Sequence, residues 1–428
     1  MEKYCIHGGK RLTGTIDISG AKNAAVAILP ATVLASDVFV IENVPRISDI
    51  FAMVQILEEL GATCKFLNKS TLEIDTRNVQ SRPLSSALTK CLRASYYFAG
   101  SLLGRFNYAS VATPGGCVFG GTRPMDMHIK GFMELGAMVP PANVPLDPEK
   151  IEAKADKLIG SYIYFDKVSV GATINVMLAA VRARGITVIE NAAREPHIVD
   201  LANFLNLMGC KVMGAGTNSI RIEGRQDLHG TNYSIIPDQI EAGTYMVAAA
   251  ATKGDVLIRN VIPKHLDTIT VKLRECGVTV EEFDDSVRIC AEGRLKPCNL
   301  KTLPHPGFPT DMQPQFTTLL AMCDGMSVVT ESVWDNRFNY LNQLRRMKAE
   351  VEIEGKHAIV HGVEKLYGAS VIANDLRAGA AMVIAGLCAE GETCIGDIYH
   401  IDRGYEDIVE KLQACGADIC RKEFPDEE

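Results

Sequence analysis

Hydrophobic and polar positions alternate along this chain in a pattern that recurs about six times. In each recurrence a polar or charged residue among small residues precedes an apolar run with helical periodicity. The six runs begin within residues 20–25, 92–95, 168–173, 238–243, 310–313 and 376–379. Unpaired N–H groups and the positive end of the helix dipole make helix starts good anion sites. The pattern therefore predicts helix starts that can converge on a polar cleft for an anionic ligand.

A second feature recurs with the same spacing, 68 to 75 residues. A helical segment ends at a residue suited to a left-handed cap, and an alternating, strand-like segment follows. The cap positions are Gly61, Gly136, Gly209, Gly277, Lys348 and Gly416, and only Lys348 is not glycine. Runs rich in β-branched residues at 38–43, 186–191 and 256–260 are predicted strands. We interpret the pattern as six α/β units, with an ordinary doubly wound α/β protein as the alternative.

Length and composition narrow the class of protein. The chain has 428 residues, which is longer than a single hydrophobic core usually supports. This length favours two domains of three units each. It is 47% apolar and 22% charged, and it contains neither a membrane-length apolar run nor a signal-peptide core. Thirteen cysteines without a Cys-x-x-Cys pair predict reduced thiols and no zinc site. The net charge of −8 argues against a general nucleic-acid binder, so a local basic cluster must capture any anion.

The segment 113–128 is the clearest candidate for chemistry. Four glycines and two prolines surround Cys117, so the backbone can approach a ligand closely. Arg123 and exposed N–H groups would lower the thiol pKa from about 8.5, whereas a bound phosphate or carboxylate would raise it. Such a thiol can donate a proton or attack as a thiolate. The alternative is an incidental cysteine in a glycine-rich loop.

Seven ordered motifs resemble the UDP-N-acetylglucosamine 1-carboxyvinyltransferase family of enolpyruvyl transferases. They are GAKNAA at 20–25, PGGC at 114–117, RPMD at 123–126, DKVSVGAT at 166–173, ENAAREP at 190–196, FPTDMQ at 308–313 and YHIDRGY at 399–405. The resemblance implies an α/β enolpyruvyl-transferase fold with two domains, each of three βαβαββ repeats in an inside-out α/β barrel. Domain 1 would span 22–235 and carry the Cys117 loop. Domain 2 would combine 1–21 with 236–428, with the active site in the cleft between the domains.

The resemblance also implies a reaction. The enolpyruvyl group of phosphoenolpyruvate would move to the 3′-hydroxyl of UDP-N-acetylglucosamine with release of phosphate, the first committed step of peptidoglycan precursor synthesis in the cytoplasm. We expect no cofactor, no metal, no nucleic acid and no membrane, and the oligomeric state stays open. Two alternatives remain: transfer to another acceptor such as shikimate 3-phosphate, and a non-catalytic UDP-sugar-sensing paralogue.

Carried over by motif, Cys117 would be the general acid and Asp311 would accept the proton of the 3′-hydroxyl, with Lys22 and Arg403 completing the catalytic set. Three of these four, Lys22, Asp311 and Arg403, are also expected to bind substrate. The other expected substrate-binding residues are Asn23, Arg93, Arg123, Pro124, Met125, Asp126, Met127, Lys167, Val168, Ser169, Val170, Val333 and Arg377. Lys22, Arg123, Arg377 and Arg403 would hold phosphoenolpyruvate, and Asn23 the reacting sugar oxygen. Val168, Val170 and Val333 would act through main-chain groups.

Each assignment has a simpler alternative. Asp311 could cap a helix, Arg403 could lie in a surface turn, and Arg93 could form a salt bridge on a helix surface. Two positions also depart from the family pattern. Five residues separate Cys117 from Arg123 where four are expected, and Gln239 stands where an arginine is usual. The longer loop leaves open the efficiency of the acid step and the sensitivity to fosfomycin, which alkylates this cysteine in the family.

Overall fold

The computed structural model describes residues 1–84, 93–112, 125–139 and 150–425. The chain divides into two compact units. Unit 1 comprises Met1–Ser19 and Pro237–Glu428, and unit 2 comprises Gly20–Ile236. Within the described ranges, no helix is long and apolar enough to span a membrane.

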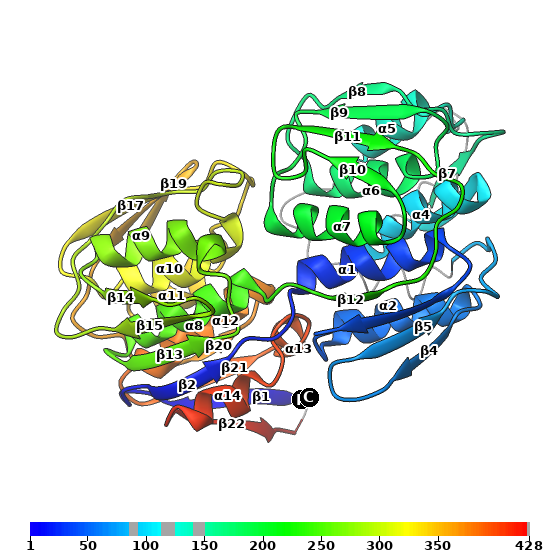
Figure 1. Ribbon diagram of the computed structural model, residues 1–428. Coiled ribbons are helices and arrows are strands. Elements are labelled where there is room, and N and C mark those ends of the chain that lie inside the picture. The colour runs from blue at the N-terminus through cyan, green and yellow to red at the C-terminus, as the bar shows by residue number, and fades with distance from the viewer. Residues whose placement is uncertain (85–92, 113–124, 140–149, 426–428) are drawn as a thin grey trace. The chain divides into compact units, whose positions relative to one another are not determined.

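Unit 2 contains two four-stranded mixed sheets and one two-stranded sheet. Its elements are α1 (Lys22–Ala31), η1 (Thr32–Leu34), β3 (Val38–Glu42), α2 (Ser48–Glu59), β4 (Thr63–Phe66), β5 (Leu72–Asp75), η2 (Arg93–Tyr96), α4 (Tyr97–Phe106), β6 (Tyr108–Ala112), α5 (Asp126–Glu134), β7 (Lys150–Lys154), β8 (Tyr162–Tyr164), α6 (Val170–Ala180), β9 (Ile186–Glu190), α7 (Pro196–Leu207), β10 (Lys211–Met213), β11 (Ser219–Glu223) and β12 (Asn232–Ser234). The strand orders are β12-β3-β5-β4, β10-β11-β9-β8 and β6-β7. Figure 1 shows α1, α6 and α7 between the two larger sheets.

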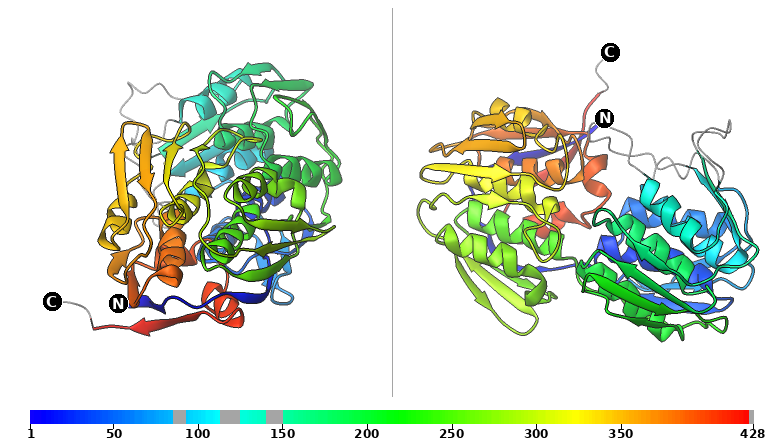
Figure 2. Two further views of the ribbon diagram at one scale, coloured as in Figure 1. Left: turned by 90° about the vertical axis from the view of Figure 1, so that its left-hand side faces the viewer. Right: turned by 90° about the horizontal axis from the view of Figure 1, so that it is seen from above.

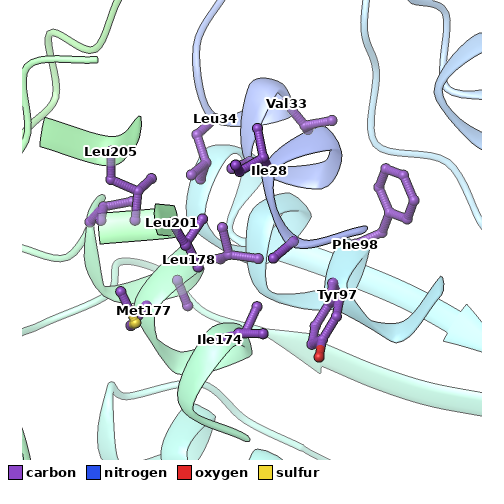
Figure 3. Packing of buried hydrophobic residues seen from close by; sticks show 14 of the residues in the cluster. Ile28, Val33, Leu34, Tyr97, Phe98, Ile174, Met177, Leu178, Leu201 and Leu205 are labelled. Atoms are coloured by element: carbon purple, nitrogen blue, oxygen red, sulfur yellow. The ribbon is translucent and has the colours of Figure 1, made fainter. Parts of the chain in front are cut away.

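The core of unit 2 is built on helices that are apolar on all sides. In α6 every residue from Ala172 to Ala180 is buried, as expected for a helix enclosed by other elements. Side chains from α1, α4, α6 and α7 meet in this core (Figure 3). Helix α4 approaches α6 closely at Gly100, where a Cβ atom would lie 2.4 Å from the Asn175 carbonyl oxygen. Glycine is therefore required there for the two helices to pack.

Unit 1 has three four-stranded mixed sheets. Its elements are β1 (Glu2–His7), β2 (Thr13–Asp17), α8 (Gln239–Ala251), β13 (Asp255–Arg259), η3 (Pro263–Leu266), α9 (Asp267–Glu275), β14 (Thr279–Glu282), β15 (Ser286–Cys290), β16 (Leu300–Lys301), η4 (Thr310–Met312), α10 (Gln313–Leu320), β17 (Met326–Thr330), α11 (Leu341–Arg346), β18 (Glu350–Glu354), β19 (His357–His361), β20 (Ser370–Ile372), α12 (Leu376–Cys388), β21 (Glu392–Gly396), α13 (Tyr399–Asp402), α14 (Ile408–Ala414) and β22 (Asp418–Glu423). The strand orders are β14-β15-β13-β2, β16-β17-β19-β18 and β20-β21-β1-β22. Strands β1 and β22 pair antiparallel, so the first and last strands lie side by side (Figures 1 and 2).

The four-stranded sheets of both units share one pairing scheme. In each, one outer strand runs parallel to its neighbour, and the other pairs are antiparallel. Helical structure begins in all six predicted segments. Helices α1, α6, α8 and α12 begin directly, whereas the 3₁₀ turns η2 and η4 precede α4 and α10. The predicted strand runs at 38–43, 186–191 and 256–260 form β3, β9 and β13.

The predicted left-handed caps are confirmed. The five glycines have φ between 89° and 103°, and Lys348 adopts the same conformation at φ 69° without being glycine. Strands follow five of the six caps. After Gly136 the described residues end at 139, and within them Met138 forms a bridge with Lys154.

Candidate active site

Asp311 lies in the short turn η4 of unit 1, where two arginines hold its carboxylate. Arg337 Nη2 lies 3.2 Å from Asp311 Oδ1, and Arg377 Nη2 lies 3.1 Å from Asp311 Oδ2. The arginine side chains are 4% and 5% exposed, but that of Asp311 is 31% exposed. The two buried arginines therefore orient the Asp311 carboxylate, which remains partly accessible to solvent. The helix-cap alternative is wrong, because Pro309 and Met312 occupy the cap positions of η4 and α10.

Arg377 is fixed at the start of α12. Asp375 Oδ1 accepts hydrogen bonds from the N–H groups of Arg377 and Ala378 at 2.8 and 3.1 Å and so caps the helix. The guanidinium donates to Tyr405 Oη at 3.3 Å and lies 5.6 Å from the centre of that ring. Burial acts to lower the pKa of Arg377, but the neighbouring Asp311, Tyr405 and Asp238 together outweigh it and the pKa is raised. Arg377 is thus a permanent buried cation.

A small hydroxyl network joins three helices around Tyr405. Its Oη lies 2.9 Å from Thr244 Oγ1 on α8, and Gln315 Nε2 on α10 donates to it at 3.2 Å. Together with the bond from Arg377 on α12, these contacts tie the second turn of α8 and the first turns of α10 and α12 to one side chain. The helix starts that the sequence pattern predicts as convergent are joined within unit 1.

Arg403 lies in the turn that follows α13, two residues before Tyr405, and its side chain is partly buried. The preceding residue, Asp402, is held from two strands. Tyr4 Oη on β1 donates to Asp402 Oδ1 at 2.7 Å, and Arg421 on β22 forms an ion pair with the other carboxylate oxygen. Strands β1 and β22 of this sheet therefore determine where the end of α13, and with it Arg403, is placed.

Lys22 is the first residue of α1 in unit 2. Its Nζ lies 2.7 Å from Asp49 Oδ2 in the first turn of α2, and the two side chains are 12% and 6% exposed. Asn23 follows and is partly buried. Asp49 was missed by sequence reasoning because an acidic residue in the first turn is common in any helix. Arg337 was missed because no motif marks it.

A buried hydrogen-bond network around Asn175 lies close in sequence to the predicted nucleotide-binding residues of unit 2. Its Nδ2 donates to the Tyr96 carbonyl oxygen at 3.0 Å and lies 3.0 Å from His128 Nδ1, while its Oδ1 accepts from Gly100 N at 2.8 Å. Tyr96 is the last residue of η2, His128 is in the first turn of α5 and Asn175 is in the second turn of α6, so this buried network joins the η2–α4 segment to α5 and α6. The rings of Tyr96 and His128 also meet edge to face, with centroids 5.1 Å apart.

The residues expected to bind the nucleotide differ in exposure. Asp126 and Lys167 are exposed, whereas five others are partly buried: Met125, Met127, Val168, Ser169 and Val170. Ser169 caps α6, since its Oγ accepts from Ala172 N at 3.3 Å. Arg93 begins η2. These residues lie at the starts of elements where main-chain N–H groups are available for an anion.

Val333 lies in unit 1, and its N–H donates to Glu331 Oε1 at 2.8 Å. The buried Glu331 also accepts from Thr302 Oγ1 at 2.8 Å and from Thr310 Oγ1 at 2.9 Å. Glu331 therefore links the Val333 loop to the turn that carries Asp311. Three predicted site residues, Cys117, Arg123 and Pro124, lie outside the described residues.

The predicted reduced state is confirmed for the eleven cysteines that the structure describes, all of which are free thiols. Raised thiol pKa values indicate that partly buried cysteines such as Cys64 and Cys388 take no part in the chemistry. Burial raises the pKa of Cys64 and Cys388 to about 12. Such thiols stay protonated at neutral pH.

Comparison with known proteins now identifies the family. The profile of EPSP synthase (3-phosphoshikimate 1-carboxyvinyltransferase) matches residues 6–412. The chain belongs to this family of enolpyruvyl transferases. Among curated members, it is 56% identical to UDP-N-acetylglucosamine 1-carboxyvinyltransferase 3 of Caldanaerobacter subterraneus subsp. tengcongensis, over 98% of this chain and 99% of the relative. It is 54% identical to UDP-N-acetylglucosamine 1-carboxyvinyltransferase of Clostridium botulinum, over 98% of this chain and all of the relative.

Solved structures of enolpyruvyl transferases share the fold. NikO from Streptomyces tendae matches with a TM-score of 0.89 at 24% identity, over 99% of both chains. EPSP synthase from Acinetobacter baumannii matches with a TM-score of 0.77 at 18% identity, over 99% of this chain and 100% of that one. The predicted family and the mixed α/β enolpyruvyl-transferase fold are therefore confirmed.

Proposed function

We propose that this enolpyruvyl transferase moves the enolpyruvyl group of phosphoenolpyruvate to the 3′-hydroxyl of UDP-N-acetylglucosamine and releases phosphate. One observation carries the proposal: the chain is 53 to 56% identical, over essentially its full length, to three enzymes named for this reaction. The reaction begins peptidoglycan precursor synthesis, and we place it in the cytoplasm. Protonation of the enol carbon creates a cation-like centre, the sugar oxygen adds to it, and elimination of phosphate restores the double bond.

The substrates are both polyanions, so cations must hold them. We assign phosphoenolpyruvate to Lys22, Arg123 and Arg403, with Arg377 nearby, and the reacting sugar oxygen to Asn23. Charge-assisted hydrogen bonds of this kind contribute roughly 1.5–3 kcal/mol each. The remaining predicted residues, from Arg93 through Val333, are assigned to the nucleotide sugar. Cys117 is assigned the role of general acid at the enol carbon.

Asp311 is assigned the proton of the 3′-hydroxyl. An aspartate is a weak base for an alcohol, since its ordinary pKa is about 3.9. Proton transfer therefore accompanies formation of the carbon–oxygen bond instead of preceding it. The contacts from Arg337 and Arg377 support this role, because they fix the direction of an accessible carboxylate before substrate arrives.

For the architecture we propose three βαβαββ repeats in each of two domains, an inside-out α/β barrel, with boundaries at 22–235 and at 1–21 plus 236–428. The shared pairing scheme of the five four-stranded sheets supports the repeats. The regular positions of the six helix starts and caps also support them. Lys22, Cys117 and Arg123 belong to the first domain and Asp311, Arg377 and Arg403 to the second, so catalysis draws on both.

Mass spectrometry of the product tests the proposal. The wild-type protein with both substrates should convert UDP-N-acetylglucosamine to a product heavier by one enolpyruvyl group. Asp311→Asn should slow conversion by at least about 10²-fold, the usual contribution of a general base, and Cys117→Ala should slow it similarly. Asp335→Asn is the matched control, because that aspartate has an 80% exposed side chain paired with Lys356. Equal rates for Asp311→Asn and Asp335→Asn would refute the assignment of the base.

A further inference from the structure

One face of the sheet β20-β21-β1-β22 carries a row of cysteines that the proposed reaction does not use. Cys5 of β1 lies opposite Cys394 of β21 and opposite Cys420 of β22. Directly paired residues of neighbouring strands share a face, so the three side chains point the same way. Tyr4 and Ile6, on either side of Cys5, belong to the core of unit 1. The cysteines therefore occupy the face of the sheet opposite to that core.

Two of these thiols and one carboxylate are close enough to share an ion. Cys5 Sγ and Cys394 Sγ lie 3.5 Å apart. Glu392 precedes Cys394 by two residues on the same strand and so lies on the same face. The two sulfurs and a Glu392 carboxylate oxygen all lie within 4.8 Å of one another. A tetrahedral ion with metal–sulfur bonds of about 2.3 Å holds two sulfurs about 3.8 Å apart, which is close to the spacing present here.

We propose that Cys5, Cys394 and Glu392 form a binding site for a thiophilic divalent cation, of which Zn²⁺ and Cd²⁺ are examples. Two sulfurs and one carboxylate are a donor set that such ions accept, whereas Mg²⁺ and Ca²⁺ require oxygen ligands alone. The fourth position is left for water or for the neighbouring Cys420. The ion would join β1 to β21, two strands nearly four hundred residues apart in sequence.

The charges around the site determine how binding depends on pH. A metal ion binds the thiolate form of cysteine, so binding competes with protons and affinity rises with pH. His7 Nε2 and Lys422 Nζ lie 3.7 and 3.6 Å from Glu392 Oε1. Three further groups face the same region: Lys10, Asp418 and Cys420.

Lys422 competes with the ion for Glu392. Its ammonium group is exposed and contacts the same carboxylate oxygen. Replacing it with methionine removes the competing charge while retaining most of the apolar length of the side chain. The Lys422→Met variant should bind the divalent ion several-fold more tightly than the wild type.

Cadmium titration of the full-length protein tests the site, with a phosphine to keep the thiols reduced. The titration uses a Cys117→Ser background, so that the proposed active-site thiol does not contribute. We expect one Cd²⁺ per chain, sulfur-to-metal ultraviolet absorption from at least two thiolates, and binding that tightens as the pH rises. Cys394→Ser should weaken binding at least tenfold and remove one thiolate from the absorption. Glu392→Gln should weaken binding and leave the absorption at saturation unchanged.

Controls separate this site from other thiols. Cys290→Ser removes a partly buried cysteine of another sheet and should change nothing. Cys298→Ser tests the second close thiol pair, in which Cys276 Sγ and Cys298 Sγ lie 3.4 Å apart in the core. Cys394 and Glu392 are not buried in the core, so their variants keep the packing of unit 1. Unchanged affinity in Cys394→Ser, or loss of binding only in Cys298→Ser, would overturn the proposal.

Discussion

At the scale of single residues, the arrangement of Asp311 is the feature with the clearest chemical consequence. Two buried arginines contact its two carboxylate oxygens, one from the start of α12 and one from the loop after β17. A carboxylate held at both oxygens cannot rotate freely, so the orientation of the proposed base is set before catalysis. Arg337 is the less obvious of the two arginines, and we assign it the role of positioning Asp311.

Replacing Arg337 tests this positioning role. Arg337→Met should lower kcat by about 10²-fold, the cost of misplacing a reacting group by about 1 Å, with a smaller change in KM. Arg294→Met is the matched control, because Arg294 is an exposed arginine of unit 1 paired with Asp324. Steady-state kinetics with circular dichroism of both variants measure the effect. A folded Arg337→Met variant with wild-type kcat would show that Arg377 alone suffices.

Asp200 is a buried carboxylate of unit 2 whose ionisation affects stability. Tyr233 Oη donates to its Oδ1 at 2.5 Å and Ile236 N to its Oδ2 at 3.4 Å. Burial raises the pKa of Asp200 to about 6, although these two hydrogen bonds act to lower it. Between about pH 4 and pH 6 the native state holds a proton that the unfolded state has released. The stability that this proton provides is complete below about pH 4 and is lost as the pH rises through about 6.

Asp200→Asn should remove this pH dependence. The shift corresponds to about 3 kcal/mol in the free energy of unfolding. Relative to the variant, the wild type should lose stability by up to that amount between pH 4 and pH 7. Denaturant unfolding of both proteins across this range measures the difference. A constant difference between the two proteins would mean that the pKa of Asp200 is not raised.

At the scale of elements, the six helix ends share one backbone conformation. Five are glycine, and Lys348 adopts it at φ 69° with an exposed side chain. A left-handed conformation disfavours any residue with a Cβ atom, so Lys348 is strained at a position where its equivalents are not. The strain is confined to the backbone of Lys348, because its exposed side chain is not part of the core.

Lys348→Gly should therefore stabilise unit 1. We expect a gain of about 0.5–1 kcal/mol, since relief of strain exceeds the extra entropy of glycine in the unfolded chain. Gly277→Ala is the reciprocal control: it has φ 91° and nothing within 4 Å of an added Cβ atom, so only backbone strain acts. It should destabilise by about 1 kcal/mol. Chemical denaturation measures both, and a destabilised Lys348→Gly would contradict this interpretation.

The end of α13 depends on strands β1 and β22. Arg421 and Tyr4 both hold Asp402, the residue before Arg403. Arg421→Met should loosen this turn and raise KM for phosphoenolpyruvate roughly tenfold, with little change in KM for the nucleotide sugar. Arg288→Met is the control, because Arg288 is also an exposed strand arginine of unit 1 with an ion pair. Equal effects on both KM values would point to general destabilisation.

Periodicity predicted the helix starts, the caps and the strands that depend on local sequence. Periodicity does not show which segments pair: β1 lies beside β22 although the two strands are at opposite ends of the sequence. The same limit applies to the site. The motifs marked Lys22, Asp311 and Arg377, but their partners Asp49 and Arg337 lie 26 or 27 residues away and carry no motif. The opposed cysteines of β1 and β21 depend on strand register that only the folded sheet reveals.

At the scale of the whole molecule, the proposed catalytic residues are divided between two units that each have a core. Lys22 starts a buried helix in unit 2, and Asp311, Arg377 and Arg403 lie on helices and turns of unit 1. Each unit presents helix starts and fixed cations, which suit one polyanionic substrate or part of one. The members of this family differ in the acceptor of the enolpyruvyl group, so the acceptor that this protein recognises determines which reaction it performs.

Phosphate release from phosphoenolpyruvate with different acceptors tests the central claim most directly. The protein should release phosphate with UDP-N-acetylglucosamine, and release should be at background with shikimate 3-phosphate or with no acceptor. Release with shikimate 3-phosphate, or no release above background with UDP-N-acetylglucosamine, would contradict the account.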